Sequence, residues 1–299
     1  MKGKKIAKMI LIILLLFTLV ITLFSLRKIY LNKIRPIKDK MSYLEKLDRN
    51  NESIKKKVNI EKNKAKNIEK ISEENIIEIE KLEKIVYENE RKLNGKVIYL
   101  TFDDGPSIYT DEILDILDKY NIKATFFVTC SSNTYEYKKI LEKNHTIGLH
   151  TCSHKYSNIY SSEENYFNDL DTISKLVESN TGYKSKYVRF PGGSSNTVSR
   201  FNKGIITRLS NMLKENGYEY YDWNIDSNDA GGANSEQIYS NVIGALQKNN
   251  RDVAMVLMHD TKVATRDALE NIIKDALDLG YTFSKISNYT PEVHHIINN

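Results

Sequence analysis

The chain contains polar side chains whose types and spacing suit a catalytic metal site. In chain order, the set is Asp103, Asp104, His150, His154, Arg189, Asp226 and His259. Two imidazoles and one carboxylate provide three protein ligands for Zn²⁺ or a similar ion and leave one position open for water, as in catalytic sites. If the backbone turns between the adjacent aspartates, one carboxylate can bind the metal while the other moves protons.

Each of these segments also has an ordinary structural explanation when it is taken alone. Two histidines at this spacing are often a surface or core pattern, and an aspartate pair followed by Gly105-Pro106 could form a turn. The remaining histidines, His145, His294 and His295, lack such neighbours, and we expect them to be solvated. The position of the polar segments relative to the predicted strands decides between the explanations.

The polar segments lie where predicted β-strands end. Apolar, β-branched and aromatic runs predict seven strands, at Val97–Phe102, Ala124–Thr129, Thr146–His150, Tyr187–Phe190, Tyr218–Trp223, Val253–Met258 and Thr282–Ile286. Helical patterns lie between most of them, at Asp111–Lys119, Glu163–Val177, Lys203–Asn216, Ser235–Gln247 and Thr265–Leu279. Strands that alternate with helices predict an α/β fold with a parallel sheet. About seven such units suggest a distorted (β/α) barrel, in which chemistry collects at the C-terminal ends of the strands.

Five segments, in this order and spacing, resemble the motifs of the NodB-like polysaccharide deacetylases, carbohydrate esterase family 4. They are the TFDDGP of Thr101–Pro106, the HTCSH of His150–His154, the RFPGG of Arg189–Gly193, the segment at Asp226 and the LMH of Leu257–His259. The resemblance covers about Lys96 to Ile286. It implies a distorted (β/α) barrel, a divalent metal and the removal of N- or O-acetyl groups from carbohydrate polymers. Zn²⁺ is the expected ion, with Co²⁺ or Fe²⁺ as alternatives, because each suits two histidines and one aspartate.

The resemblance implies a role for each residue of the set. Asp103 resembles the general base, and Arg189 the arginine that orients it. Asp104, His150 and His154 resemble the metal ligands.

The remaining roles concern the leaving group and the oxyanion. His259 resembles the general acid, and Asp226 falls where the family places an aspartate that pairs with this histidine. Such a partner would favour the imidazolium and keep a proton available for the departing amine. A backbone N–H just after Pro191, at Gly192, is expected to hold the oxyanion.

Two departures from the family pattern affect the expected substrate groove. The family usually has a tryptophan four residues after this aspartate, whereas Ala230 stands there in this chain. Trp223, the only tryptophan, is expected in the core of a strand. Gly192 and Gly193 replace a frequent aromatic residue after the proline, which should widen the groove.

The two cysteines exclude a disulfide-rich scaffold. Cys152 lies between the two metal-site histidines, and Cys130 follows the neighbouring predicted strand. The pair could be close enough for a disulfide, but we favour two separate buried thiols.

The N-terminal part of the chain has a different character. Residues 9–26 form an uncharged apolar run of 18 residues after four lysines, which is long enough for a membrane helix. No small-residue cleavage site follows, so we predict an uncleaved signal anchor after a cytoplasmic tail, residues 1–8; a cleaved signal is the alternative. Residues 27–95, without Gly or Pro from Lys40 to Leu93, are interpreted as a helical stalk that could form a homodimer, or as a solvated linker. Asn94-Gly95 predicts the boundary with a domain of residues 96–299.

The formal charge of +5 averages over these two unlike parts. Residues 1–95 contain 23 Lys and Arg against 13 Asp and Glu, whereas residues 96–299 contain 21 against 26. An acidic second part argues against a nucleic-acid partner. The apolar content of 40% argues against a polytopic membrane protein.

These observations lead to one functional hypothesis and its alternatives. We expect a single-pass cell-membrane enzyme with an extracytoplasmic domain that removes N-acetyl groups from peptidoglycan, on N-acetylglucosamine. The resemblance implies that such deacetylation makes the wall a poorer substrate for lysozyme-like hydrolases. The alternatives are deacetylation of N-acetylmuramic acid, of a chitin-like or other acetylated polysaccharide, removal of O-acetyl esters, or a wall-binding module whose site is degenerate.

Overall fold

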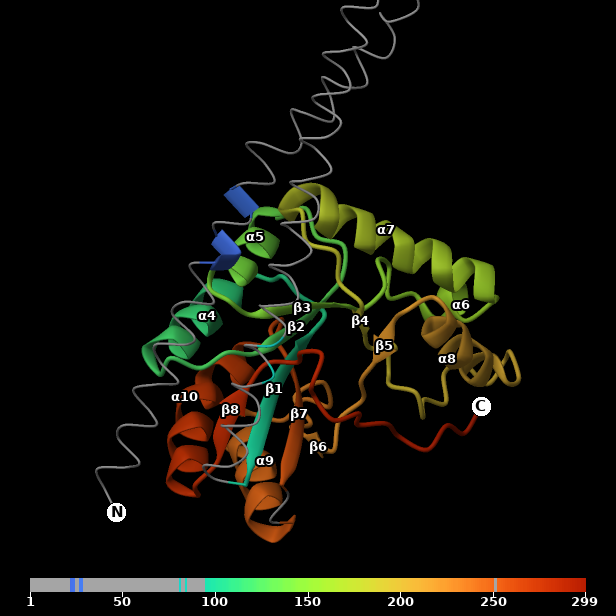
Figure 1. Ribbon diagram of the computed structural model, residues 1–299. Helices are drawn as coiled ribbons and strands as arrows, with labels where there is room; N and C mark the ends of the chain where they lie inside the picture. Colours follow the sequence, from blue (N-terminus) through green and yellow to red (C-terminus); the bar gives the residue numbers. More distant parts are fainter. Residues whose placement is uncertain (1–21, 25–26, 29–80, 82–83, 85–94, 250–251) are drawn as a thin grey trace, which may run out of the picture. The chain divides into compact units, whose positions relative to one another are not determined.

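The computed structural model describes residues 22–24, 27–28, 81, 84, 95–249 and 252–299 (Figure 1). The chain divides into two units, residues 1–89 and residues 90–299. Within the described ranges, no helix has the length and apolar character needed to cross a membrane. The predicted cytoplasmic tail lies outside the described residues, as do nearly all of the predicted anchor and stalk, so these assignments stay predictions.

A parallel β-sheet forms the centre of the second unit. Its strands are β1 Val97–Asp103, β2 Thr125–Val128, β3 Thr146–Leu149, β4 Tyr187–Val188, β5 Glu219–Tyr220, β6 Ile225–Asp226, β7 Val253–His259 and β8 Thr282–Ser284. They follow the order β5-β4-β3-β2-β1-β7-β6, with β8 paired to β1. In the part of the chain that the structure describes, no pairing joins β5 to β6. The expected parallel sheet is confirmed, in the form of an open half-barrel.

β1 lies in the middle of the sheet and is buried along its whole length. β7 pairs with all of it, from Val97 opposite Val253 to Asp103 opposite His259. β8 pairs with residues 97–99 of β1, and β2 pairs with residues 101–103. Asp103 and His259 are therefore neighbours where two paired strands end.

The helices lie around the outside of the sheet (Figure 1). They are α4 Thr110–Lys119, α5 Tyr135–Glu142, α6 Tyr156–Ile159, α7 Glu163–Thr181, α8 Ile205–Glu215, α9 Ser235–Asn249 and α10 Val263–Asp278. The longest, α7, begins where Ser162 Oγ accepts a hydrogen bond from Asn165 N and ends at Gly182, which has a φ of 73°. The five expected helices are present, and α5, α6 and β6 are additional elements too short to show a clear period in the sequence.

The side chains of β1 alternate between two cores, as the two-residue period of a strand requires. Ile98, Leu100 and Phe102 belong to the larger core, which also contains the buried side chains of the helices. Val97 and Tyr99 belong to a smaller core inside the half-barrel, together with Phe127, Tyr187, Tyr221, Met255 and Ile286. Asp103 continues this inner row, so its carboxylate points toward the inside of the half-barrel.

The segment after β8 returns past β5 toward the C-terminus (Figure 1). Asp222 N donates to Val293 O at 2.8 Å, and Tyr221 Oη donates to Thr290 O at 3.3 Å. His295 N then donates to Asp222 Oδ2 at 2.8 Å. The segment covers the residues after β5, whose backbone groups would otherwise be exposed at this edge of the sheet.

The expectation that His145 is solvated is wrong. Its side chain is only 2% exposed, and its Nδ1 accepts a hydrogen bond from Ala124 N at 3.0 Å. Burial holds the pKa of His145 well below its ordinary value, so it is a neutral core histidine at the start of β3. His294 is exposed and His295 is partly buried.

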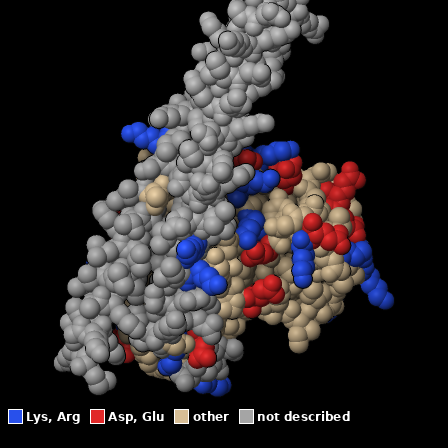
Figure 2. Space-filling view, viewed as in Figure 1, with Lys and Arg blue, Asp and Glu red and all other residues tan. Residues whose placement is uncertain are grey.

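Charged side chains of both signs are spread over the visible face of the described residues (Figure 2). Among the described residues, Lys119 pairs with Glu270 at 2.8 Å and Arg266 with Glu112 at 2.7 Å. On this face, the excess of acidic residues after Gly95 is thus not gathered into one block.

Candidate active site

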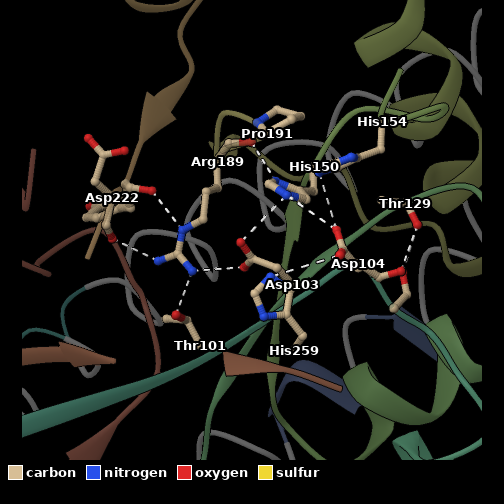
Figure 3. A network of polar contacts seen from close by, with 12 residues as sticks. Thr101, Asp103, Asp104, Thr129, His150, His154, Arg189, Pro191, Asp222 and His259 are labelled. Atoms are coloured by element: carbon tan, nitrogen blue, oxygen red, sulfur yellow. Dashed lines mark hydrogen bonds and ion pairs between the residues drawn. The ribbon is translucent and has the colours of Figure 1, made fainter. Parts of the chain in front are cut away.

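The two adjacent aspartates both reach the site because the backbone turns between them. Asp103 ends β1, and Asp104 has a φ of 71°, a conformation uncommon for a residue other than glycine. Thr129, which follows β2, donates to Asp104 O at 2.9 Å and holds this turn. Figure 3 shows the two carboxylates on neighbouring sides of His150. Strained backbone of this kind is often found at functional sites.

Asp104, His150 and His154 form a group that fits a divalent metal. Asp104 Oδ1 lies 3.6 Å from His150 Nε2 and 3.5 Å from His154 Nε2. One ligand atom from each residue can be chosen so that all three lie within 4.8 Å of one another. Asp104 Oδ1 is buried and makes no hydrogen bond among the described residues, so a cation would satisfy an otherwise uncompensated oxygen.

His150 is prepared for this role by its second nitrogen. Its Nδ1 lies 2.8 Å from Arg189 O, and because a carbonyl only accepts, Nδ1 carries the hydrogen and Nε2 keeps a free lone pair. Burial lowers the pKa of His150, which favours the neutral imidazole that binds metals. Thr151 and His154 also have positive φ values, 59° and 53°.

Arg189 fills the inside of the half-barrel beneath the site. Its side chain is 0% exposed, and its Nη1 lies 2.9 Å from Asp103 Oδ1 and 2.6 Å from Thr101 Oγ1. Its Nε and Nη2 donate to Tyr221 O at 2.9 Å and to Asp222 O at 2.8 Å. Figure 3 shows the guanidinium directed at Asp103. This buried arginine fixes the orientation of the carboxylate and compensates its charge.

His259 pairs with Asp229, and the expectation that Asp226 is its partner is wrong. His259 Nδ1 lies 2.7 Å from Asp229 Oδ1, and His259 N donates to Asp229 Oδ2 at 2.6 Å. Thr265 Oγ1 donates to the same carboxylate at 2.6 Å. Asp226 is exposed and caps the turn after β6 by accepting from Asn228 N at 2.7 Å. The turn brings the side chain of Asp229 into contact with His259, whereas the side chain of Asp226 is exposed to solvent.

The pairing determines the protonation of both groups. Burial alone would lower the pKa of His259, but its hydrogen bond to Asp229 and the charges of Asp103, Asp229 and Asp104 raise the pKa to about 9. Burial alone would raise the pKa of Asp229, but its hydrogen bonds with His259 and Thr265 lower it. His259 is therefore protonated at neutral pH, and its Nε2 faces Asp104 Oδ2 at 3.9 Å.

Pro191 and Gly192 bring backbone to the edge of the site. Gly192 N makes no hydrogen bond among the described residues. Gly193, whose φ is 77°, is covered by Trp223, since a Cβ added to it would lie 2.8 Å from the indole ring. A Cβ on Gly192 would lie 3.3 Å from Asn196 and 3.7 Å from Tyr156 Oη. The side chains of Trp223, Asn196 and Tyr156 therefore lie beside the two glycines, and the expectation of a wider groove stays a prediction.

The expectation that Trp223 lies in the core of a strand is wrong. It lies in the connection between β5 and β6 and is partly exposed. It meets His295 edge-on, with ring centroids 4.6 Å apart. Trp223 thus places an aromatic wall beside the RFPGG segment.

Cys130 and Cys152 form a disulfide, so the expectation of two separate thiols is wrong. Their Cα atoms are 4.5 Å apart, and Cys130 N donates to Cys152 O at 3.2 Å. Cys152 N and Ser153 N also donate to Asp169 at 2.6 and 2.9 Å. The segment between the two histidines is therefore tied to the end of β2 and to α7.

Comparison with known proteins identifies the family. Residues 90–220 match the model of the family described as polysaccharide deacetylase. A peptidoglycan-N-acetylglucosamine deacetylase of Bacillus cereus is 32% identical over 220 residues, which cover 69% of this chain and 75% of that protein. The chain belongs to the polysaccharide deacetylase family. It is accordingly a hydrolase of the class that acts on acetyl amide bonds.

Solved structures and another relative agree with this assignment. The putative polysaccharide deacetylase YheN of Bacillus subtilis is 30% identical over 215 residues, 69% of this chain and 73% of that protein. The catalytic domain of a peptidoglycan N-acetylglucosamine deacetylase from Eubacterium rectale matches with a TM-score of 0.66 and 44% identity, covering 68% of this chain and 94% of that one. A Bacillus cereus polysaccharide deacetylase structure matches at 0.59 and 30%, covering 67% and 96%.

The structure brings together six of the seven side chains that the sequence singled out. Asp103, Asp104, His150, His154, Arg189 and His259 surround one space (Figure 3), and Asp226 lies outside it. Sequence reasoning assigned no role to Asp229 or Thr101. The signal for Asp229 was present, since it stands three residues after Asp226 in the same acidic segment.

Proposed function

We propose that this polysaccharide deacetylase hydrolyses the N-acetyl groups of peptidoglycan, on N-acetylglucosamine. The observation that carries the proposal is the grouping of a three-ligand metal site with a buried base and a protonated histidine at the end of two paired strands. The names of relatives from Bacillus cereus and Eubacterium rectale specify the sugar for those proteins. Their similarity covers 69% and 68% of this chain, which supports the same substrate here.

Asp104, His150 and His154 would hold the divalent ion, with Zn²⁺ favoured by the mixed imidazole and carboxylate ligands. When bound, such an ion lowers the pKa of water and polarises a carbonyl oxygen. Asp103, oriented by Arg189, accepts the proton of the attacking water. A single proton-transfer residue of this kind contributes about 10²–10⁴-fold in rate.

The other face of the site completes the reaction. Gly192 N–H, free of partners among the described residues, donates to the oxygen that becomes negative when water adds to the acetyl carbon. His259 Nε2 donates its proton to the departing nitrogen, while Asp229 holds the opposite ring nitrogen. Acetate and a free amine are the products.

We also propose that the enzyme acts outside the cytoplasm, held by an uncleaved N-terminal anchor. The apolar run of residues 9–26 supports a membrane attachment. The Cys130–Cys152 disulfide supports an oxidising compartment, because such bonds rarely persist in the cytosol. Peptidoglycan is an insoluble substrate outside the membrane, and a tether keeps an enzyme near it.

The test is to incubate the purified, metal-loaded chain with intact peptidoglycan and then digest the glycan into muropeptides for mass analysis. We expect acetyl loss from N-acetylglucosamine and none from N-acetylmuramic acid. Asp103→Asn is the control; it should keep the metal, since Asp103 is not one of the three ligands, and lose turnover. Acetyl loss confined to the other sugar would contradict the assigned substrate. Bound metal without acetate release from any glycan would contradict the enzymatic proposal.

A further inference from the structure

Tyr156 lies at the edge of the site, between a metal ligand and the expected oxyanion backbone. It begins α6, two residues after His154, and the two rings have centroids 5.1 Å apart. On its other side, its Oη lies 3.7 Å from the position that a Cβ on Gly192 would occupy. The phenol therefore borders the Gly192 backbone.

The ring of Tyr156 is held in this position by a row of aromatic side chains. It stacks on Tyr160 with centroids 6.3 Å apart and planes inclined by 5°. Tyr160 is fully buried, stacks in turn on Tyr166, and donates from Oη to Pro191 O at 2.7 Å. The same tyrosine thus positions both the ring of Tyr156 and the backbone before Gly192.

Unlike Tyr160, Tyr156 has a hydroxyl that the fold does not use. Among the described residues, its Oη has no hydrogen-bond partner. A phenol keeps its hydrogen at neutral pH and can donate it. A fixed, unused donor at the edge of a reaction centre is the arrangement that stabilises developing charge without reorganisation.

We propose that Tyr156 Oη donates a hydrogen bond to the acetyl oxygen as the tetrahedral intermediate forms, beside the bond from Gly192 N–H. The inference rests on the proposed deacetylase function and adds a catalytic side chain to it. This chain has Gly192 directly after Pro191, and Tyr156, in the segment after β3, lies beside that glycine. No proton is transferred by Tyr156; the bonds that form and break remain those of acetyl hydrolysis.

The test is Tyr156→Phe, which keeps the stacked ring and removes only the hydroxyl. Loss of one oxyanion donor typically lowers kcat by about 10²–10³-fold, and we expect this fall with KM and metal content unchanged. Tyr120→Phe is the matched control. It removes a phenol that donates to Glu270 at 2.7 Å, between α4 and β2 and away from the site, and its kcat should equal that of the parent enzyme.

Other outcomes of the same measurements overturn the proposal. A raised KM with unchanged kcat would mean that the hydroxyl binds a sugar group in the ground state. A pH–rate profile that changes shape would make Tyr156 an acid or base rather than a neutral donor. Unchanged kinetics would leave the hydroxyl without a role. If the parent enzyme releases no acetate, the proposed function itself fails, which is a distinct result.

Discussion

At the scale of single residues, the site depends on which of two aspartates meets His259. Asp226 and Asp229 lie in one turn, but only Asp229 is buried against the imidazole. The buried carboxylate keeps a proton on His259 by raising its pKa. His259, the proposed general acid, thus owes its positive charge to a residue in a different segment of the chain.

Asp229→Asn should move the pH dependence of the reaction. Removing the charge lowers the pKa of His259, so the protonated form is lost at a lower pH and the alkaline limb of the kcat profile shifts downward. Asp226→Asn is the matched control, because it changes an exposed carboxylate in the same turn. A profile that moves with Asp226→Asn and stays fixed with Asp229→Asn would contradict the pairing. The measurement is acetate release between about pH 6 and pH 10.

At the scale of elements, the active site is carried by loops that other segments hold in place. The loop after β3 contains both proposed histidine ligands and is fixed to the end of β2 by the disulfide. The loop after β1 contains Asp104 and packs on Asp260, which follows β7. Gly105 permits this approach, since a Cβ there would lie 2.1 Å from the carboxylate of Asp260.

Replacing both cysteines by serine should lower stability and loosen the histidine loop. The bridge closes a loop between residues separated by 22 positions, and constraining such a loop in the unfolded chain contributes about 3 kcal/mol. Urea unfolding should show this loss, and metal titration should show weaker binding. The parent protein in reductant is the control and should match the variant. An unchanged unfolding midpoint in both would refute the stabilising role.

Asp260 should make the stability of the protein depend on pH. Its carboxyl is 1% exposed, and one oxygen has no partner among the described residues. Burial, with smaller effects of the Asp104 and Asp103 charges, raises its pKa to about 7, against a hydrogen bond from Thr110 that lowers it. The unfolded chain has an aspartate pKa of about 3.9. The folded form thus holds the proton more tightly, and this stabilisation is full below about pH 4 and is lost as pH rises through about 7.

Asp260→Asn keeps the bond from Thr110 and removes the ionisation. The variant should unfold at the same urea concentration as the parent near pH 4 and be more stable near pH 8, by about 1–4 kcal/mol. Both proteins are measured with a chelator, because a bound cation would alter the charge nearby. A difference that does not vary with pH would show that the carboxyl does not titrate in this range.

The sequence predicts the strands well and the loops poorly, for a physical reason. Long apolar runs such as β1 and β7 can only be buried, so their ends, and the polar residues at those ends, are located by composition alone. β4, β5 and β6 have two residues each and leave little periodic signal. Which residues contact Asp229 and Cys130 depends on the conformation of the loops. Neither sequence spacing nor secondary-structure propensity predicts that conformation. The position of Tyr156 beside Gly192 becomes apparent only from the three-dimensional structure.

At the scale of the whole molecule, we propose that the N-terminal anchor determines the location of the protein and that the acidic domain carries out the reaction. The basic N-terminal part carries no recognised chemistry, whereas all site residues lie after Gly95. A membrane tether beside an anionic surface would benefit from flanking lysines and arginines, at about 1 kcal/mol each. Because the site residues lie outside the proposed anchor, activity and membrane attachment can be measured separately.

Deleting residues 2–26 should move the protein from the membrane fraction to the soluble fraction. The loss of the apolar run removes the only uncharged segment of this length in the sequence. Acetate release from soluble muropeptides should be unchanged, while deacetylation of the wall in cells should fall. Ultracentrifugation with immunodetection reports the location. If the undeleted protein is already in the soluble fraction and is shorter at its N-terminus than the encoded chain, the apolar run is instead a cleaved signal.

The contact between Asp222 and His295 links the C-terminal segment to the turn beside the site. The two residues are separated by 73 positions, and Asp222 accepts from Ser194 N and Oγ beside the glycines of the site. The third donor to this carboxylate is His295 N. The turn next to Gly192 is thus held in part by a segment far away in the sequence. A chain truncated before His295 would therefore lack one of the three hydrogen bonds that hold the Asp222 carboxylate beside the site.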